Sequence, residues 1–159
     1  MIALETCLPL LIAPQKLLTL ERLDIAVKWR FFRHLQEGDD PDSERVYRWH
    51  IKERTRGREP RSWKRSVEDY VTSCKGLLES MLASGFSPDH PLEYGQNGRL
   101  RAGAHRLACS LLLGLDAYYV VVPLNGTATW GENWFVRHNI ASADLQRIKL
   151  DWKHLKWKL

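Results

Sequence analysis

The sequence predicts a single α/β domain in which a small mixed sheet is flanked by helices. Three observations point to this fold class. A chain of 159 residues fits one domain. Along the chain, segments with apolar residues at helical spacing alternate with short extended segments. No internal repeat and no flexible linker divides these segments, so we expect one domain.

The N-terminal part predicts one extended segment followed by a helix. Residues 2–12 are apolar and end before Pro14, which predicts a buried strand or an extended packing segment. The next apolar residues recur at spacings of three and four, at Leu20, Leu23, Val27, Phe31 and Leu35. This spacing predicts a helix over residues 20–35 with one buried stripe and with Thr19 as its N-cap.

Two further helices are expected on either side of a basic segment. Residues 43–53 predict the first, and residues 66–84 predict the second, with Ser66 as N-cap and Gly85 after its end. Between them, residues 54–65 are rich in arginine. We interpret this segment as a solvated basic loop, with a loop facing phosphate as the alternative.

The next stretch predicts the sheet. Residues 92–94 and 99–101 flank Asn97-Gly98, which is a strong signal for a hairpin turn. An apolar helix is expected to follow from Ala104. Ala117–Val122 is rich in β-branched and aromatic residues, which predicts a strand and allows its burial on both faces.

The C-terminal part predicts helix again. Trp130, Trp134 and Phe135 fall in a loop or a short helix, and a longer helix begins near Ser142. Its last residues alternate bulky side chains with lysine. Helices therefore surround the sheet segments at both ends of the sequence.

Composition narrows the function classes. The chain has 24 Lys and Arg against 19 Asp and Glu, a net charge of +5, which suits phosphates of nucleotides, nucleic acid or lipid. Its three cysteines form no CxxC pair, so neither a metal site nor a disulfide framework is indicated. No apolar run reaches the roughly 18 residues of a membrane span. The first residues lack the positive region of a signal peptide, so we expect a cytoplasmic protein.

The segment Gly103-Ala104-His105-Arg106 stands where a strand turns into a helix. A glycine there lets backbone N–H groups approach an anion, and a helix start carries a partial positive charge. Arg106 can bind two phosphate oxygens as a fork, and His105 can donate a further hydrogen bond. The pattern predicts a polyphosphate cradle, with a capped tight turn as the alternative.

The order of these elements resembles the ParB/sulfiredoxin-like superfamily. The likeness rests on LLESMLASG at 77–85, NGRLRAGAHRLA at 97–108 and LGLDAYYVVVP at 113–123. A weaker likeness, at 22–28, 49–51, 66–70 and 134–135, is to small ParB-like proteins of bacterial surface-polysaccharide clusters. The resemblance implies one such domain over residues 1–159, with a helical N-terminal insertion at about 19–60 and a C-terminal helical extension at about 128–159.

The resemblance also implies a ligand: ATP or another nucleotide with Mg²⁺, held by Gly103, Ala104, His105 and Arg106. Ala104 occupies the place of the reactive cysteine of sulfiredoxins, so sulfinic acid repair is not expected. Ala102 is closest to the position of an acidic residue in ParB-like serine kinases, so a phosphotransferase would need a carboxylate from elsewhere. The DNA-binding and dimerisation regions of ParB proteins are not recognisable.

Asp24, Lys28 and His50 are the predicted catalytic residues. Asp24 and Lys28 lie one helical turn apart, which favours a general base beside a cationic phosphate ligand. The alternative is an exposed ion pair worth ~0.2–0.5 kcal/mol. His50 could titrate near neutral pH, with a surface or capping histidine as the alternative.

The sequence therefore predicts a nucleotide-binding protein that acts as an ATP-dependent phosphotransferase or nucleotide phosphohydrolase. Its expected acceptor is the hydroxyl of a small molecule or sugar, in surface-polysaccharide biosynthesis. One alternative is a non-catalytic nucleotide-responsive module, which Ala102 favours. Another is a ParB-like DNA-binding protein, which the basic segment favours but no recognition helix does. The expected partners are the nucleotide and a small-molecule or glycan acceptor. A homodimer is compatible with the sequence, and nucleic acid is not favoured.

Overall fold

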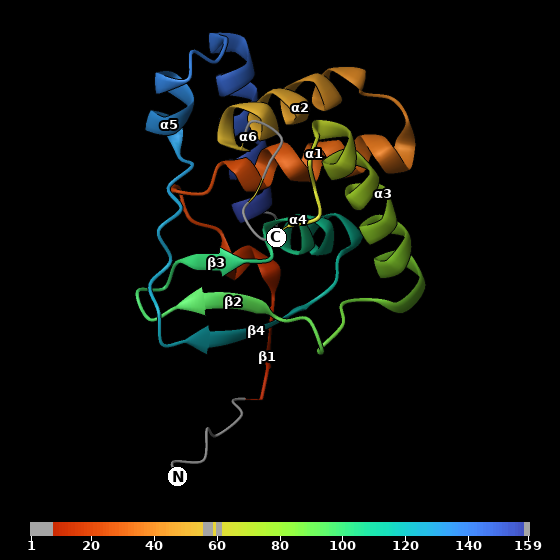
Figure 1. Ribbon diagram of the computed structural model, residues 1–159, viewed down its shortest axis with the longest axis vertical. Coiled ribbons are helices and arrows are strands. Elements are labelled where there is room, and N and C mark those ends of the chain that lie inside the picture. The colour runs from red at the N-terminus through yellow and green to blue at the C-terminus, as the bar shows by residue number, and fades with distance from the viewer. Residues whose placement is uncertain (1–7, 56–58, 60–61, 158–159) are drawn as a thin grey trace.

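The fold combines a four-stranded mixed sheet with six α-helices and one short 3₁₀ helix in the part of the chain described here (Figure 1). The computed structural model describes residues 8–55, 59 and 62–157. The predicted α/β class is confirmed. Residues 2–7 of the expected N-terminal strand lie outside the described residues.

The elements have the following bounds. The strands are β1 (Leu10–Ile12), β2 (Leu92–Gly95), β3 (Leu100–Ala102) and β4 (Ala117–Val122). The α-helices are α1 (Asp24–Glu37), α2 (Pro41–Thr55), α3 (Val67–Ser84), α4 (Ala104–Leu113), α5 (Glu132–Arg137) and α6 (Ser142–Trp157). The 3₁₀ helix is η1 (Pro14–Leu17).

The sheet has the strand order β1-β4-β2-β3. β4 runs parallel to β2 and antiparallel to β1, and β2 and β3 form an antiparallel hairpin. The predicted Asn97-Gly98 turn is confirmed, because Gly98 takes a φ of 75° and its N–H donates to the Gly95 carbonyl at 3.0 Å. α4 follows the hairpin and lies between the sheet and α1 (Figure 1).

The expected burial of β1 is wrong, and β4 is less buried than expected. Leu10 and Leu11 of β1 are 59% and 56% exposed, since β1 is a short edge strand. Val121 of β4 is 53% exposed, so β4 is not buried on both faces. The helices gather mainly on one side of the sheet, and β1 and β4 lie at the other side (Figure 1).

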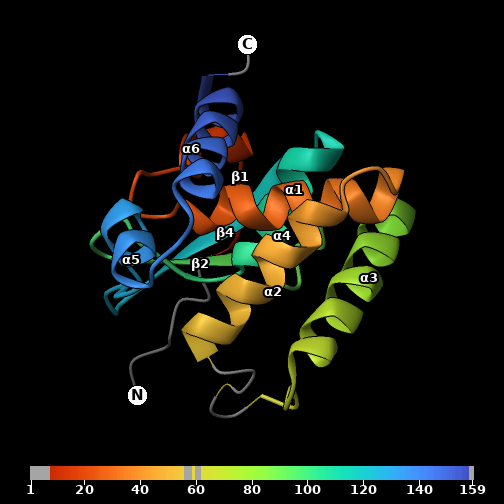
Figure 2. The same ribbon diagram turned by 90° about the horizontal axis from the view of Figure 1, so that it is seen from above.

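α1 is the central helix, with α2, α4 and α6 packed around it (Figure 2). Its first turns are buried on every side, from Asp24 through Trp29, so the expectation of a single buried stripe is wrong. The helix begins at Asp24 and not at residue 20. Thr19 is therefore not its N-cap: its carbonyl accepts hydrogen bonds from the Arg22 N–H and from the Trp152 indole.

α3 begins and ends as predicted. The Ser66 hydroxyl accepts from the Asp69 N–H, and the Asp69 carboxylate accepts from the Ser66 N–H, which together make a capping box. α2 is longer than expected and includes Arg54. Among the described residues, no helix is both long enough and apolar enough to cross a membrane.

Candidate functional site

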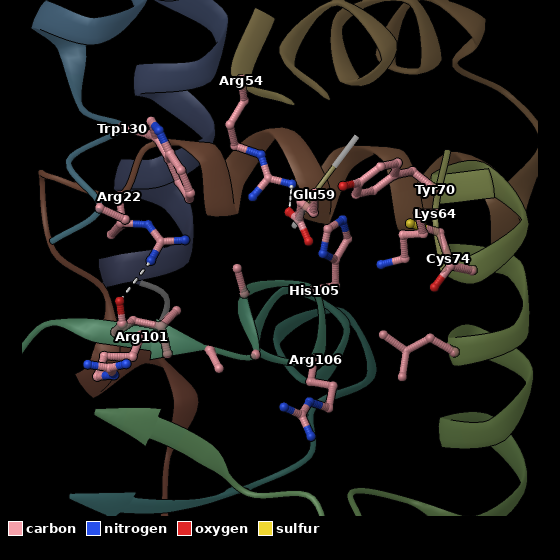
Figure 3. A pocket seen from close by; sticks show the side chains of 17 residues that line it. Arg22, Arg54, Glu59, Lys64, Tyr70, Cys74, Arg101, His105, Arg106 and Trp130 are labelled. Carbon is pink, nitrogen blue, oxygen red and sulfur yellow. Dashed lines mark hydrogen bonds and ion pairs between the residues drawn. The ribbon is translucent and has the colours of Figure 1, made fainter. Parts of the chain in front are cut away.

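A pocket of about 420 Å³ lies where β3 passes into α4, and the end of α2 and the start of α3 close it from above (Figure 3). Five positively charged side chains line it: Arg22, Arg54, Lys64, Arg101 and Arg106. Among the described lining residues, Glu59 is the one carboxylate. The pocket also includes all four residues of the predicted cradle, from Gly103 to Arg106.

The start of α4 forms the floor of this pocket. Gly103 has a φ of 101°, and a Cβ built on it would lie 2.5 Å from Leu92 Cδ2, so both backbone and space require glycine. The first N–H to donate within the helix is that of Leu107, which binds the Gly103 carbonyl at 2.9 Å. The N–H groups of the three residues before Leu107 are thus left free by the helix, at its positive end.

Asp24 is buried beside the pocket and forms ion pairs with the side chains of Arg22 and Lys28. Its carboxylate accepts from Arg22 Nε at 2.8 Å and Nη2 at 2.9 Å, and from Lys28 Nζ at 2.6 Å. Asp24 and Lys28 are completely buried, so the alternative of an exposed ion pair is wrong. Burial alone would raise the pKa of Asp24, but Arg22 and Lys28 reverse this and hold it well below its usual range.

This geometry gives Asp24 a positioning role. Both carboxylate oxygens are occupied by donors, and the residue does not line the pocket. A general base needs a free lone pair within reach of the acceptor hydroxyl. Asp24 instead orients Arg22, which does line the pocket. Burial lowers the pKa of Lys28 to about 8, although the charge of Asp24 acts in the opposite direction.

Trp130 stands beside two of the pocket cations (Figure 3). The guanidinium carbons of Arg22 and Arg54 lie 4.9 and 4.8 Å from the centre of its ring, within cation–π range. Arg54 Nη2 also lies 2.9 Å from Glu59 Oε1. The indole and the carboxylate therefore hold these guanidinium groups at the pocket wall.

His50 is completely buried and does not line the pocket. Neither of its ring nitrogens has a hydrogen-bond partner among the described residues. The ring packs at 5.1 Å from Trp134 and 5.6 Å from Phe135. Burial, followed by the charge of Lys28, holds its pKa well below the usual range, so the ring is neutral at pH 7. The predicted surface or capping position of His50 is wrong.

His105 and Arg106 have different surroundings. His105 Nε2 lies 2.8 Å from the hydroxyl of Tyr47 on α2. Arg106 donates to the His90 carbonyl, and its guanidinium extends away from Arg22 and Arg54 (Figure 3). Burial lowers the pKa of Arg106, yet a guanidinium stays charged in a protein.

The sequence interpretation missed several pocket residues. Arg54 and Lys64 belong to the segment assigned to a solvated basic loop, and both line the pocket. These two side chains therefore contact a pocket and not only solvent. Arg101 and Trp130 carried no local signal, since they reach the pocket only through the tertiary fold.

The described part of the chain contains no group of three or more His, Cys, Asp or Glu side chains that could hold a metal ion. Comparison of the chain with protein families, with curated proteins and with solved structures found no match. The ParB/sulfiredoxin-like resemblance therefore stays a prediction from the motifs.

Proposed function

We propose that this chain binds the polyphosphate group of a nucleotide in the pocket at the start of α4. The observation that carries the proposal is a surplus of positive charge. Five cationic side chains line the site; Arg22 is paired with Asp24 and Arg54 with Glu59, which leaves Lys64, Arg101 and Arg106 without a carboxylate partner among the described residues. Gathering like charges in a partly enclosed site is unfavourable unless an anion compensates them. A tri- or tetra-anionic polyphosphate supplies that compensation.

The backbone supports the same ligand. The start of α4, whose first N–H groups have no partner within the helix, lines a site of about 420 Å³, within the range of about 300–1,000 Å³ for small-molecule pockets. These donors complement phosphate oxygens whatever base the nucleotide carries. ATP is the nucleotide that the motif resemblance favours.

Magnesium would arrive with the nucleotide as part of the substrate. The described chain offers no cluster of metal ligands, and Glu59 is paired with Arg54 at 2.9 Å. Phosphate oxygens can hold the ion without a dedicated protein cage. The proposed ligand is therefore a nucleotide or its magnesium complex.

Calorimetric titration tests the proposal. Phosphate, pyrophosphate, triphosphate, ADP, ATP, CTP and GTP would be compared with and without Mg²⁺. Affinity should rise with the number of phosphates and fall as salt increases, because each charge contact is screened. Arg54→Gln should weaken triphosphate binding by about tenfold or more, since a charge-assisted hydrogen bond is worth ~1.5–3 kcal/mol.

The matched control is Arg45→Gln. Arg45 is also on α2, is 56% exposed in its side chain and pairs with Asp42 and Asp144 away from the pocket. This variant should bind triphosphate as the wild type does. No binding of any polyphosphate to the wild type, or equal losses in both variants, would contradict the proposal.

Phosphotransfer to a small-molecule or sugar hydroxyl is the second candidate function. Glu59 favours it, because its carboxylate lines the pocket beside Arg54 and is partly exposed (Figure 3). A carboxylate in that position can accept the proton of an attacking hydroxyl. Surface-polysaccharide precursors are the acceptors that the motif resemblance favours.

Turnover assays separate this candidate from a binding module. ADP release would be followed with ATP, Mg²⁺ and a panel of sugars and other small hydroxyl compounds. Glu59→Gln should retain ATP binding and lose turnover by about 10²-fold or more. Bound ATP without turnover on any acceptor would favour the non-catalytic module, and normal turnover in the variant would exclude Glu59 as the base.

A further inference from the structure

We propose that Tyr47 is a positioning residue that fixes His105 as the Nδ1–H tautomer, so that a neutral imidazole donates a hydrogen bond into the pocket. The effect of this tautomer on ligand binding rests on the proposed polyphosphate site, whereas the tautomer itself can be measured without any ligand. Tyr47 lies on α2 and His105 lies in the first turn of α4, 58 residues further along the chain.

Three polar groups, Cys74, the buried Tyr47 and His105, follow one another within hydrogen-bond distance beside the pocket. Cys74 Sγ lies 3.1 Å from the Tyr47 hydroxyl, and that hydroxyl lies 2.8 Å from His105 Nε2. The remaining ring nitrogen, Nδ1, has no hydrogen-bond partner among the described residues, and His105 lines the pocket. The ring thus has one nitrogen bound to the interior and one available to a ligand.

The protonation states of Cys74, Tyr47 and His105 decide which group donates in each hydrogen bond. Burial raises the pKa of the Cys74 thiol to about 11 and places the pKa of Tyr47 well above its usual range. Both groups therefore carry their protons at pH 7. The phenol has one proton, and an imidazole nitrogen is a much better acceptor for it than a thiol sulfur. Tyr47 donates to Nε2, the thiol donates to the phenol oxygen, and the ring proton stays on Nδ1.

The surroundings keep the imidazole neutral and in one orientation. Burial, followed by the charge of Lys28, holds the pKa of His105 well below its usual range. Phe31 stacks on the Tyr47 ring with centroids 4.3 Å apart, and Phe32 meets the His105 ring edge-on at 6.3 Å. A site already rich in cations thus gains a donor without gaining another charge. With Nδ1 deprotonated, the same ring would present a lone pair that repels a phosphate oxygen.

NMR of protein labelled with ¹⁵N at histidine tests the tautomer directly. Long-range ¹H–¹⁵N correlation distinguishes Nδ1–H from Nε2–H, and a His105→Asn sample assigns the signal among the six histidines. The wild type should show His105 as Nδ1–H. In Tyr47→Phe, which keeps the stacked ring but removes the hydroxyl, the Nε2–H population should rise and pyrophosphate should bind about tenfold more weakly.

Tyr119→Phe is the control. It removes a hydroxyl on β4, outside the pocket, and should leave both the tautomer and the affinity unchanged. An Nε2–H tautomer in the wild type, or an unchanged tautomer in Tyr47→Phe, would overturn the inference. A wild type that shows Nδ1–H, responds to Tyr47→Phe and still binds no pyrophosphate would support the Tyr47–His105 relation and contradict the proposed function.

Discussion

Replacing Asp24 with asparagine should destabilise the fold strongly. The substitution preserves size but leaves Lys28, which is completely buried, and Arg22, which is 6% exposed, without a counter-charge. Breaking a buried ion pair by removing one partner costs about 3–5 kcal/mol. That is a large fraction of the about 5–15 kcal/mol that stabilises a typical domain.

The loss should depend on pH in a defined direction. The pKa of Asp24 is lower in the folded chain than in the unfolded chain. Its stabilising contribution is therefore complete above about pH 4, the unfolded value, and disappears as pH falls through the folded value. The difference between wild type and Asp24→Asn should narrow in acid. In the wild type, Lys28 has a folded pKa of about 8 against 10.5, so stability should rise with pH between these values.

Urea unfolding followed by tryptophan fluorescence measures these free energies. Glu132→Gln is the control, because Glu132 pairs with Lys149 at the surface and should contribute only ~0–1 kcal/mol. Should Asp24→Asn fail to fold, the double variant Asp24→Asn with Lys28→Met removes both charges of that pair and should regain much of the loss. A loss below about 1 kcal/mol in Asp24→Asn, or a difference that does not change in acid, would refute the reasoning.

Three further variants test backbone conformation and packing. Gly103→Ala should lose more than ~1 kcal/mol, because φ is 101° and the new Cβ would meet Leu92 Cδ2 at 2.5 Å. Gly76→Ala should raise the free energy of unfolding by ~0.4–1 kcal/mol, because this helical glycine has open space around it. If urea unfolding showed Gly103→Ala to be more stable than Gly76→Ala, the reasoning for both glycines would be contradicted. His50→Phe should keep or raise stability at pH 7, since both ring nitrogens are unpartnered. The folded pKa of His50 is lowered, so the wild type should lose stability below about pH 6.5, and the variant should lose less there in thermal unfolding.

Elements with strong local signals were predicted well from the sequence. Ser66 and Asp69 cap α3 through side chains three residues apart, and Asn97-Gly98 closes the hairpin through its own backbone. Gly103 marks the start of α4 because only glycine takes its backbone conformation without strain. Each of these signals acts within a few residues, so neighbouring sequence is enough to identify it.

The burial of α1 was not predictable from spacing. A helix with Asp24 and Lys28 one turn apart normally exposes that face to water. Here α2, α4 and α6 surround the first turns, and the two charges neutralise each other inside the protein. The signal that was present is the apolar run Ile25, Ala26 and Val27 between them, which is typical of a helix buried on all sides.

The pocket shows why residue type alone does not assign a role. Asp24 has the chemistry of a base, yet its carboxylate accepts three hydrogen bonds from Arg22 and Lys28 and does not line the pocket. Glu59 comes from the basic segment that we interpreted first as a solvated loop, yet its carboxylate lines the pocket. A carboxylate whose lone pairs are occupied by buried cations orients those cations, whereas one that is partly exposed can still meet a substrate. For the proposed phosphotransfer the candidate base is therefore Glu59, whereas Asp24 positions Arg22.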